Sequence, residues 1–507
     1  MRVVRVTAPN NQREGAEVLS WYAVALVLPT AFIALFDWRK GLIAMIIVAL
    51  LQDPARKLEL DRPVYFTLLV GIVFAVAYLR AQVNTRFSPT QIPGWKHFLR
   101  TPFILLMVLL AAQGANSLVR YGNPIIVGIG ALSYLAPLPA LLTGYHFALK
   151  RGKTGIERWL TWYLIAALVV LPSILLEYLG VDWQVLGDVG EGFLMFQEDS
   201  ILTANAGFFR ASEIAAWHTA TAVCVLLLLS SVRRISTKRV VMAILIIVAL
   251  LAMGILTGRR KIFVEIAIFV SIYVSLLALF GKGGVKLAVG AILGGVLSYL
   301  LVVWFVDERP SGLSAQDAIR YQRYAERGAT VGYDVMDRFV GLGLEPIQWA
   351  IDGFGWLGGG LGVASQGAQH FGGGAEIFGG AGEGGLGKIT AELGVPGLAI
   401  ALWFGFAALR YGWHVLKFVS QRSTAVARLA YGLVAFLVAN LAVFFVATQL
   451  FGDLFVLLLL GMVAGFFLAT PVLAEREQVQ RSASAPVKSP RPMGVPGAGW
   501  ARRVGRP

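Results

Sequence analysis

Long apolar segments are the feature of this sequence that most restricts its fold. Segments 160–179, 240–257, 285–306 and 454–473 consist mostly of apolar residues. A helix needs roughly 20 such residues to cross the hydrocarbon core of a bilayer. Only 14% of the 507 residues are charged, whereas a soluble protein averages about 25%. Because a soluble core cannot bury this much apolar surface, the sequence predicts an integral membrane protein.

The fold class predicted is all-α, a polytopic transmembrane helix bundle of about 12–13 spans. The candidate spans are residues 19–36, 41–52, 64–82, 103–118, 124–148, 160–179, 212–231, 240–257, 261–280, 285–306, 393–410, 429–448 and 454–473. The second is short for a span, so twelve is the alternative. The predicted divisions are a polar segment 1–18, the first ten spans in 19–306, a large extracytoplasmic loop 307–389 that is helical and then glycine-rich, the last spans in 390–473, and a disordered tail 474–507.

The distribution of basic residues predicts the orientation of these spans. The net charge is +15, and this excess follows the positive-inside rule rather than indicating nucleic-acid binding. The basic segments predicted to be cytoplasmic are 150–158, 233–239, 282–286, 410–428 and the C-terminal tail. The segments predicted to lie outside are 180–211, 258–260, 307–392 and 449–453. The orientation of the N-terminal half stays open, because a single span separates two basic segments, 56–62 and 86–100.

Three basic residues on the predicted outer side are candidates for binding an anion. Arg210 precedes a span in GFFRASEIAAWH, and Arg259 and Arg260 stand in the short turn of ILTGRRKIFVEI. Cations in an external turn act against the positive-inside rule, which favours a function for them, and Arg binds phosphate through a fork of donors. The alternatives are structural. Arg210 would pair with Glu213 or snorkel at a helix end, and the arginine pair would contact Glu265 or lipid headgroups.

The glycine-rich segment 353–387 is a further candidate feature. Its backbone amides can cradle an anion, and its aromatic residues give it something to pack against. The alternative is an external linker. His370 and Glu383 in this segment are candidates for a general base, although each is also an ordinary loop residue. His218 lies about two turns into a span and is expected to hydrogen-bond to a neighbouring helix. The single cysteine and the scattered histidines show no metal-ligand spacing.

Together these segments resemble the O-antigen ligase and O-antigen polymerase superfamily of bacterial envelope glycan assembly. The resemblance rests on RASE at 210–213, TGRRK at 257–261, GFGWLGGGLG in the outer loop and ITAELGVPGL at 389–398, in that order. One departure is that members of the family carry a His-Asn pair shortly before the E-x-G turn, where this chain reads GAGEGGLGKITAELG. Glu383 takes approximately that place, and His370 lies further upstream.

The resemblance implies a GT-C-like glycosyltransferase of the bacterial inner membrane, with a cytoplasmic C-terminus, that acts in O-antigen or exopolysaccharide biosynthesis. Its donor would be a glycan on undecaprenyl diphosphate. Arg210, Arg259 and Arg260 would bind the diphosphate, where negative charge develops, and His370 or Glu383 would assist the acceptor hydroxyl. No metal or cofactor is expected, and the partners are the lipid-linked glycan, the bilayer and other polysaccharide assembly proteins. The alternatives are a transporter of lipid-linked oligosaccharide or an anionic solute, and a non-catalytic assembly subunit.

Overall fold

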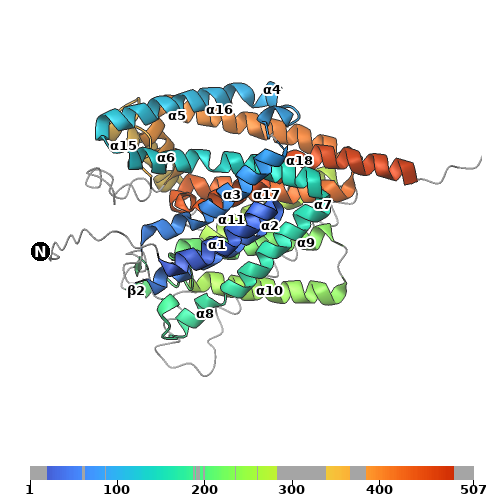
Figure 1. Ribbon diagram of the computed structural model, residues 1–507, viewed down its shortest axis with the longest axis horizontal. Helices are drawn as coiled ribbons and strands as arrows, with labels where there is room; N and C mark the ends of the chain where they lie inside the picture. The colour runs from blue at the N-terminus through green and yellow to red at the C-terminus, as the bar shows by residue number, and fades with distance from the viewer. Residues whose placement is uncertain are drawn as a thin grey trace, which may run out of the picture.

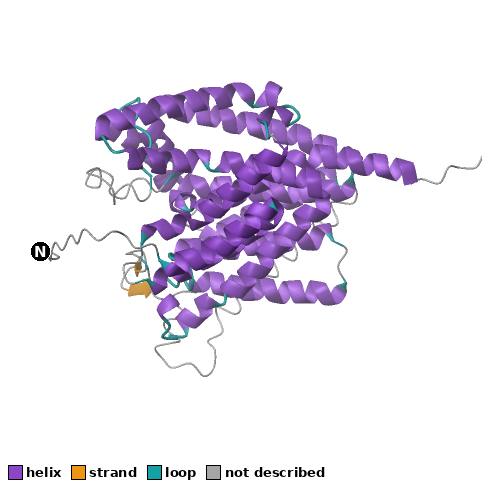
Figure 2. Ribbon diagram, viewed as in Figure 1, coloured by secondary structure: helices purple, strands orange, loops and turns teal. Residues whose placement is uncertain are grey.

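The computed structural model describes residues 20–59, 63–85, 87–186, 189, 194–197, 200–233, 236–259, 261–281, 339–365 and 384–484. Over these residues the chain is a bundle of long helices with one short β-hairpin (Figure 1, Figure 2). Nine helices in the described ranges are long and apolar enough to cross a membrane. The prediction of an all-α polytopic bundle is confirmed. The candidate span 285–306 and most of the loop 307–389 lie outside the described residues.

The elements follow one another along the chain with short connections. The first half contains α1 (Trp21–Phe36), α2 (Trp38–Leu58), η1 (Val64–Leu68), α3 (Leu69–Thr85), η2 (Pro89–Gln91), α4 (Trp95–Phe98), α5 (Arg100–Tyr121), α6 (Pro124–Leu135), α7 (Pro137–Val170), α8 (Ser173–Tyr178) and η3 (Gln184–Leu186). The antiparallel pair of β1 (Leu194–Gln197) and β2 (Ser200–Thr203) follows. The remaining elements are α9 (Ser212–Val232), α10 (Thr237–Leu256), α11 (Lys261–Phe280), η4 (Phe339–Leu344), α15 (Glu345–Phe354), α16 (Gly385–Arg422), α17 (Thr424–Val446), η7 (Thr448–Gly452) and α18 (Leu454–Ser484).

Glycine breaks two of the long helices. Gly152 in α7 has a φ of 66° and Gly394 in α16 a φ of 71°, a conformation that costs glycine little. Phe147 and Trp159, on either side of Gly152, both contact the ring of Phe466 in α18. The chain therefore turns back at Gly152, and α7 supplies the end of one predicted span and the beginning of the next.

The core of the bundle is centred on α9 and α18. Their most apolar stretches are 83% and 78% buried, whereas those of α10 and α5 are only 22% and 28% buried. A helix that is apolar on all sides and still exposed requires lipid around it. Figure 1 shows α5 and α16 along one flank and α10 along the opposite flank, with the buried helices between them. This distribution is that of a multi-pass membrane protein.

Helix termini gather at two ends of the bundle. At the first, named here the Arg210 end, Ser20 before α1 contacts Glu59 after α2, and α9, α11 and α18 begin. At the second, named the Arg151 end, Lys150 lies 3.5 Å from Thr85 at the end of α3. In Figure 1 the Arg210 end is at the left, with α8 and β2, and α18 leaves the bundle at the right.

This arrangement answers the question that the sequence left open about the N-terminal half. Because α1 and α2 form a hairpin, Lys57 lies at the Arg210 end, where it contacts Gly207. Residues 87–100 lie at the Arg151 end, since Tyr145 and Tyr411 donate hydrogen bonds to the backbone carbonyls of Gln91 and Pro93. The two basic segments are therefore on opposite sides.

Two predicted boundaries differ from the structure. The segment 41–52 looked too short for a span, but α2 has 21 residues and is about 31 Å long at 1.5 Å per residue. The prediction of disorder from residue 474 was wrong for 474–484, which continue α18. The sequence there is rich in strong helix formers, and Glu477 pairs with Arg481 one turn on, at 2.6 Å.

Candidate functional site

Residues 204–211, named here the anchored loop, connect the β-hairpin to α9 and are held by side chains of neighbouring helices. Glu177 of α8 accepts hydrogen bonds from two consecutive backbone N–H groups of this loop, the first with a length of 2.9 Å. Ser173, also on α8, accepts a third at 2.9 Å. Asn205 donates to the carbonyl of Leu256, at the end of α10, at 2.7 Å. Because side chains bind its backbone groups, the loop has a defined path although it is irregular.

Arg210 stands at the end of this loop between two carboxylates. Its Nη1 atom lies 2.7 Å from Oδ2 of Asp453 and 3.7 Å from Oδ1 of Asp53. Its backbone N–H also donates to Asp53, at 3.0 Å. Lys57, one turn after Asp53 on α2, donates to the carbonyl of Gly207 at 2.7 Å. The side chain of Arg210 is 15% exposed and those of both aspartates are 4% exposed, so the cluster is almost closed to solvent.

The two carboxylates stabilise the charged form of Arg210. Burial alone would lower the pKa of the Arg210 guanidinium, but the attraction of Asp453 and Asp53 outweighs it and raises that pKa. Arg210 is therefore a permanent cation whose orientation is set by two carboxylates. The alternative that Arg210 pairs with Glu213 is wrong, because Glu213 has a different partner.

That partner is Arg259, which lies beside the start of α9. Its Nη2 atom is 2.9 Å from Oε1 of Glu213, and its Nε donates to the Ser212 hydroxyl at 2.8 Å. Arg259 and Arg210 therefore both lie at the N-terminal end of α9, although they come from separate segments of the chain. Arg260 lies outside the described residues.

Glu265 forms part of a separate buried cluster inside the bundle and is not the partner of Arg259. The amide Nδ2 of Asn440 in α17 donates to Glu265 at 3.4 Å, and its Oδ1 accepts from the indole of Trp217 at 2.7 Å. Close by, His218 and Tyr163 share a hydrogen bond of 3.0 Å, so the prediction that His218 bonds to a neighbouring helix is confirmed. These contacts connect α7, α9, α11 and α17.

The described part of the glycine-rich segment, residues 355–365, is packed on the break in α16. The N–H of Val395 donates to the Trp356 carbonyl at 2.9 Å, and the N–H of Gly359 donates to the Ala391 carbonyl at 2.7 Å. The linker interpretation is wrong for these residues. Their backbone closes the break at Gly394, while His370 and Glu383, the predicted general bases, lie outside the described residues.

Glu392 of the E-x-G turn is fully buried beneath the same loop. Its Oε1 atom accepts a hydrogen bond from Ser365 at 2.8 Å. Gln113 of α5 donates to the Leu357 carbonyl at 2.7 Å. Two of the motifs that carry the family resemblance, 353–362 and 389–398, therefore belong to a folded unit with α5.

The sequence reasoning missed the two aspartates that hold Arg210. Asp453 stands in the short turn before α18, and Asp53 follows a predicted span. Both are ionisable residues at the edge of apolar segments, and such residues mark functional sites by default. Their position at the edge of apolar segments is the sequence signal that would have identified them.

A scan of the sequence against protein-family models found no match, and a search of curated proteins found no relative. The resemblance to O-antigen ligases and polymerases therefore rests on the motifs and their order in this chain. The architecture establishes an all-α, multi-pass membrane protein with a buried charged cluster at one end.

Proposed function

We propose that this protein is a membrane glycosyltransferase of the O-antigen polymerase or ligase type. It transfers or polymerises glycan from an undecaprenyl-diphosphate-linked donor at the outer face of the bacterial inner membrane. The observation that carries the proposal is the convergence of Arg210 and Arg259 at the start of α9. Both cations are held in place by carboxylates at the edge of the apolar bundle, where ionisable residues mark functional sites by default.

The local geometry supports binding of a diphosphate here. The N-cap residue of α9 is Ala211, which has no side-chain acceptor for the first N–H groups of the helix. The positive end of the helix dipole and the two guanidinium groups therefore act on the same region. When the bond between the sugar and the diphosphate breaks, negative charge develops on the leaving diphosphate, and preorganised cations stabilise it.

The carboxylates beside Arg210 have a positioning role in this proposal. Asp53 and Asp453 fix the guanidinium before substrate arrives, so that little reorganisation is needed during the reaction. His370 and Glu383 remain the candidates for accepting the proton of the acceptor hydroxyl. The proposed roles thus divide between cations at the start of α9 and a base from the glycine-rich segment.

The orientation in the membrane follows from charge. The basic segments 150–158 and 410–428 lie at the Arg151 end, which the positive-inside rule assigns to the cytoplasm. α18 ends there, so the C-terminus is cytoplasmic in this proposal. The Arg210 end then faces outward, where a lipid-linked donor is used after it has crossed the membrane.

The test is genetic and uses the producing host. Arg210→Ala and Arg259→Ala are compared with Lys417→Ala, an exposed cation of α16 at the opposite end, at equal protein levels in the membrane. The proposal predicts that both arginine variants lose long-chain surface glycan and accumulate the lipid-linked precursor on the outer leaflet, while Lys417→Ala does not. Unchanged glycan would contradict the proposal. Precursor retained on the inner leaflet would favour a transporter instead.

A further inference from the structure

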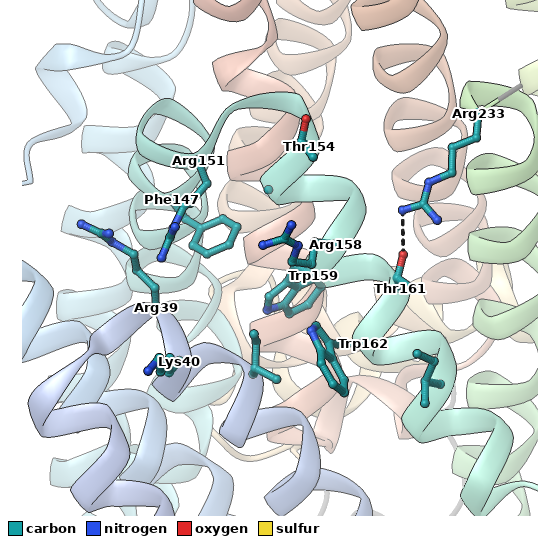
Figure 3. A pocket seen from close by; sticks show the side chains of 13 residues that line it. Arg39, Lys40, Phe147, Arg151, Thr154, Arg158, Trp159, Thr161, Trp162 and Arg233 are labelled. Atoms are coloured by element: carbon teal, nitrogen blue, oxygen red, sulfur yellow. Dashed lines mark hydrogen bonds between the residues drawn. The ribbon is translucent and has the colours of Figure 1, made fainter.

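A cavity of about 730 Å³ opens at the Arg151 end, far from the cluster around Arg210. It lies between the start of α2, the turn within α7 and the end of α9 (Figure 3). Its basic lining residues are Arg39, Lys40, Arg151, Arg158 and Arg233. No Asp or Glu lines it among the described residues. In Figure 3 Arg151 and Arg158 lie on either side of the Phe147 ring, Arg39 and Lys40 extend from α2 at the left, and Trp159 and Trp162 lie below Arg158.

Most of these cations have no acidic partner within the described ranges. Glu157 is shared by Lys153 at 2.9 Å and Arg233 at 3.3 Å, and the Asp37 carboxylate accepts the backbone N–H of Arg39 at 3.0 Å. The ion pairs recorded for the described residues include none with Arg39, Lys40, Arg151 or Arg158. The Nε atom of Arg39 is buried and has no hydrogen-bond partner there.

The positive-inside rule accounts for basic residues at this end but not for their arrangement around a cavity. Like charges that face one space repel one another, and this repulsion is relieved when an anion occupies the space. Arginine forks suit phosphate oxygens in particular. The lining therefore fits a phosphate group.

The apolar wall of the cavity indicates where that phosphate comes from. Trp162 and Ile165 line the cavity, and Val169 continues the same face of α7 away from it. These three side chains are 47%, 47% and 73% exposed. In a bilayer this stripe lies against acyl chains, directly next to the cations. A soluble phosphate would contact only the cations. A phospholipid would contact the cations with its headgroup and the apolar stripe with its acyl chains.

We propose that this cavity binds the phosphate headgroup of an anionic lipid from the surrounding leaflet, with its acyl chains along the Trp162 face of α7. Basic pockets between transmembrane helices bind anionic lipid headgroups in this manner. The site is separate from the region proposed for glycan transfer, because the two lie at opposite ends of the bundle. A lipid headgroup bound here would contact both the α7 turn and the start of α2.

The test uses the full chain reconstituted in phosphatidylcholine vesicles with increasing amounts of phosphatidylglycerol that carries brominated acyl chains. Bromine quenches tryptophan at short range, and the difference between the wild type and Trp162→Phe isolates the signal of Trp162. At equal mole fraction, brominated phosphatidylglycerol is expected to quench Trp162 more strongly than brominated phosphatidylcholine. Equal quenching by the two lipids would overturn the proposal without any change to the cations.

A matched pair of triple variants then tests the cations. One carries Arg39→Gln, Arg151→Gln and Arg158→Gln in the cavity. The control carries Lys238→Gln, Arg239→Gln and Lys417→Gln, which remove the same charge from exposed positions at the same end.

The cavity triple is expected to raise the phosphatidylglycerol fraction for half-maximal quenching at least about tenfold, because each basic residue near an anionic lipid contributes about a factor of five. The control triple is expected to leave that fraction unchanged. Equal effects of the two triples would show general surface attraction and overturn the proposal. Millimolar inorganic phosphate could instead displace the lipid from the wild type and have no such effect on the cavity triple. That result would assign the site to a soluble phosphate and would equally overturn the proposal.

Discussion

Replacing Arg210 with Met removes the cation that lies between Asp53 and Asp453. The two carboxylates are 4% exposed and would lose their closest counter-charge, with Lys57 left as the cation beside Asp53. Removing one partner of a buried ion pair costs about 3–5 kcal/mol, most of it the cost of the charge left behind. The contact of 2.7 Å with Asp453 is the closer of the two pairs. We therefore expect Arg210→Met to lower the free energy of unfolding by about 4 kcal/mol.

The rescue variant separates this reasoning from a simple loss of packing. Arg210→Met combined with Asp53→Asn and Asp453→Asn removes the cation together with both of its carboxylates, and Asn at position 53 can still accept the backbone N–H bond of residue 210. We expect it to recover at least half of the loss, since neutral replacement of a whole buried ion cluster costs little. The measurement is denaturant unfolding of the purified protein in detergent. Wild-type stability in Arg210→Met, or no recovery in the triple variant, would refute the reasoning.

Three further substitutions test other parts of the structure by the same unfolding assay. Glu177→Gln keeps the size of the side chain but weakens two charge-assisted bonds to the anchored loop, with an expected loss of about 2 kcal/mol. Asn440→Leu leaves the Trp217 indole N–H unpaired inside the bundle, with an expected loss of about 1–3 kcal/mol. Gly362→Ala places a Cβ atom 2.0 Å from the carbonyl oxygen of Ile126 at a φ of +92°, and we expect at least about 2 kcal/mol of destabilisation.

Each of these variants has its own control. Thr161→Val removes a hydroxyl of α7 that accepts a bond from Arg233 at 2.9 Å and sets the background for a polar loss elsewhere, so an equal effect of Glu177→Gln would argue against a special role for the anchored loop. Trp217→Phe removes the donor, so Asn440→Leu made in that background distinguishes the loss of this bond from general packing. Gly355→Ala shares a positive φ with Gly362 but has no atom within 4 Å of the added Cβ. Equal losses in the two glycine variants would show backbone strain alone rather than a steric clash.

The fold was predictable from the sequence because the signal for a membrane helix is local. A run of apolar residues needs no knowledge of the rest of the chain to be recognised as a span. The turn within α7 followed from two such runs separated by basic residues around Gly152. The orientation of the N-terminal half could not be predicted, because it depends on the hairpin that α1 and α2 form. The charged residues at the ends of these helices do not indicate that hairpin.

The candidate site was predictable only in part, for a physical reason. Arg210 and Arg259 stand out locally as cations beside apolar runs on the predicted outer side. Their partners are set by tertiary packing, which brings Asp53 from α2 and Asp453 from the start of α18 to the same point. The structural alternative that paired Arg210 with Glu213, the nearest acidic residue in sequence, therefore named the wrong arginine.

Transfer by the purified protein is the most direct test of the central claim. The chain is reconstituted in vesicles with the lipid-linked glycan extracted from the producing host, and free polyprenyl diphosphate and glycan length are measured together. The proposed function predicts that free polyprenyl diphosphate increases with the wild type and with Lys417→Gln but not with Arg259→Gln. Glycan length increases with it where the lipid-linked glycan is also the acceptor. Failure of the wild type to release polyprenyl diphosphate from an intact donor, or undiminished release by Arg259→Gln, would contradict it.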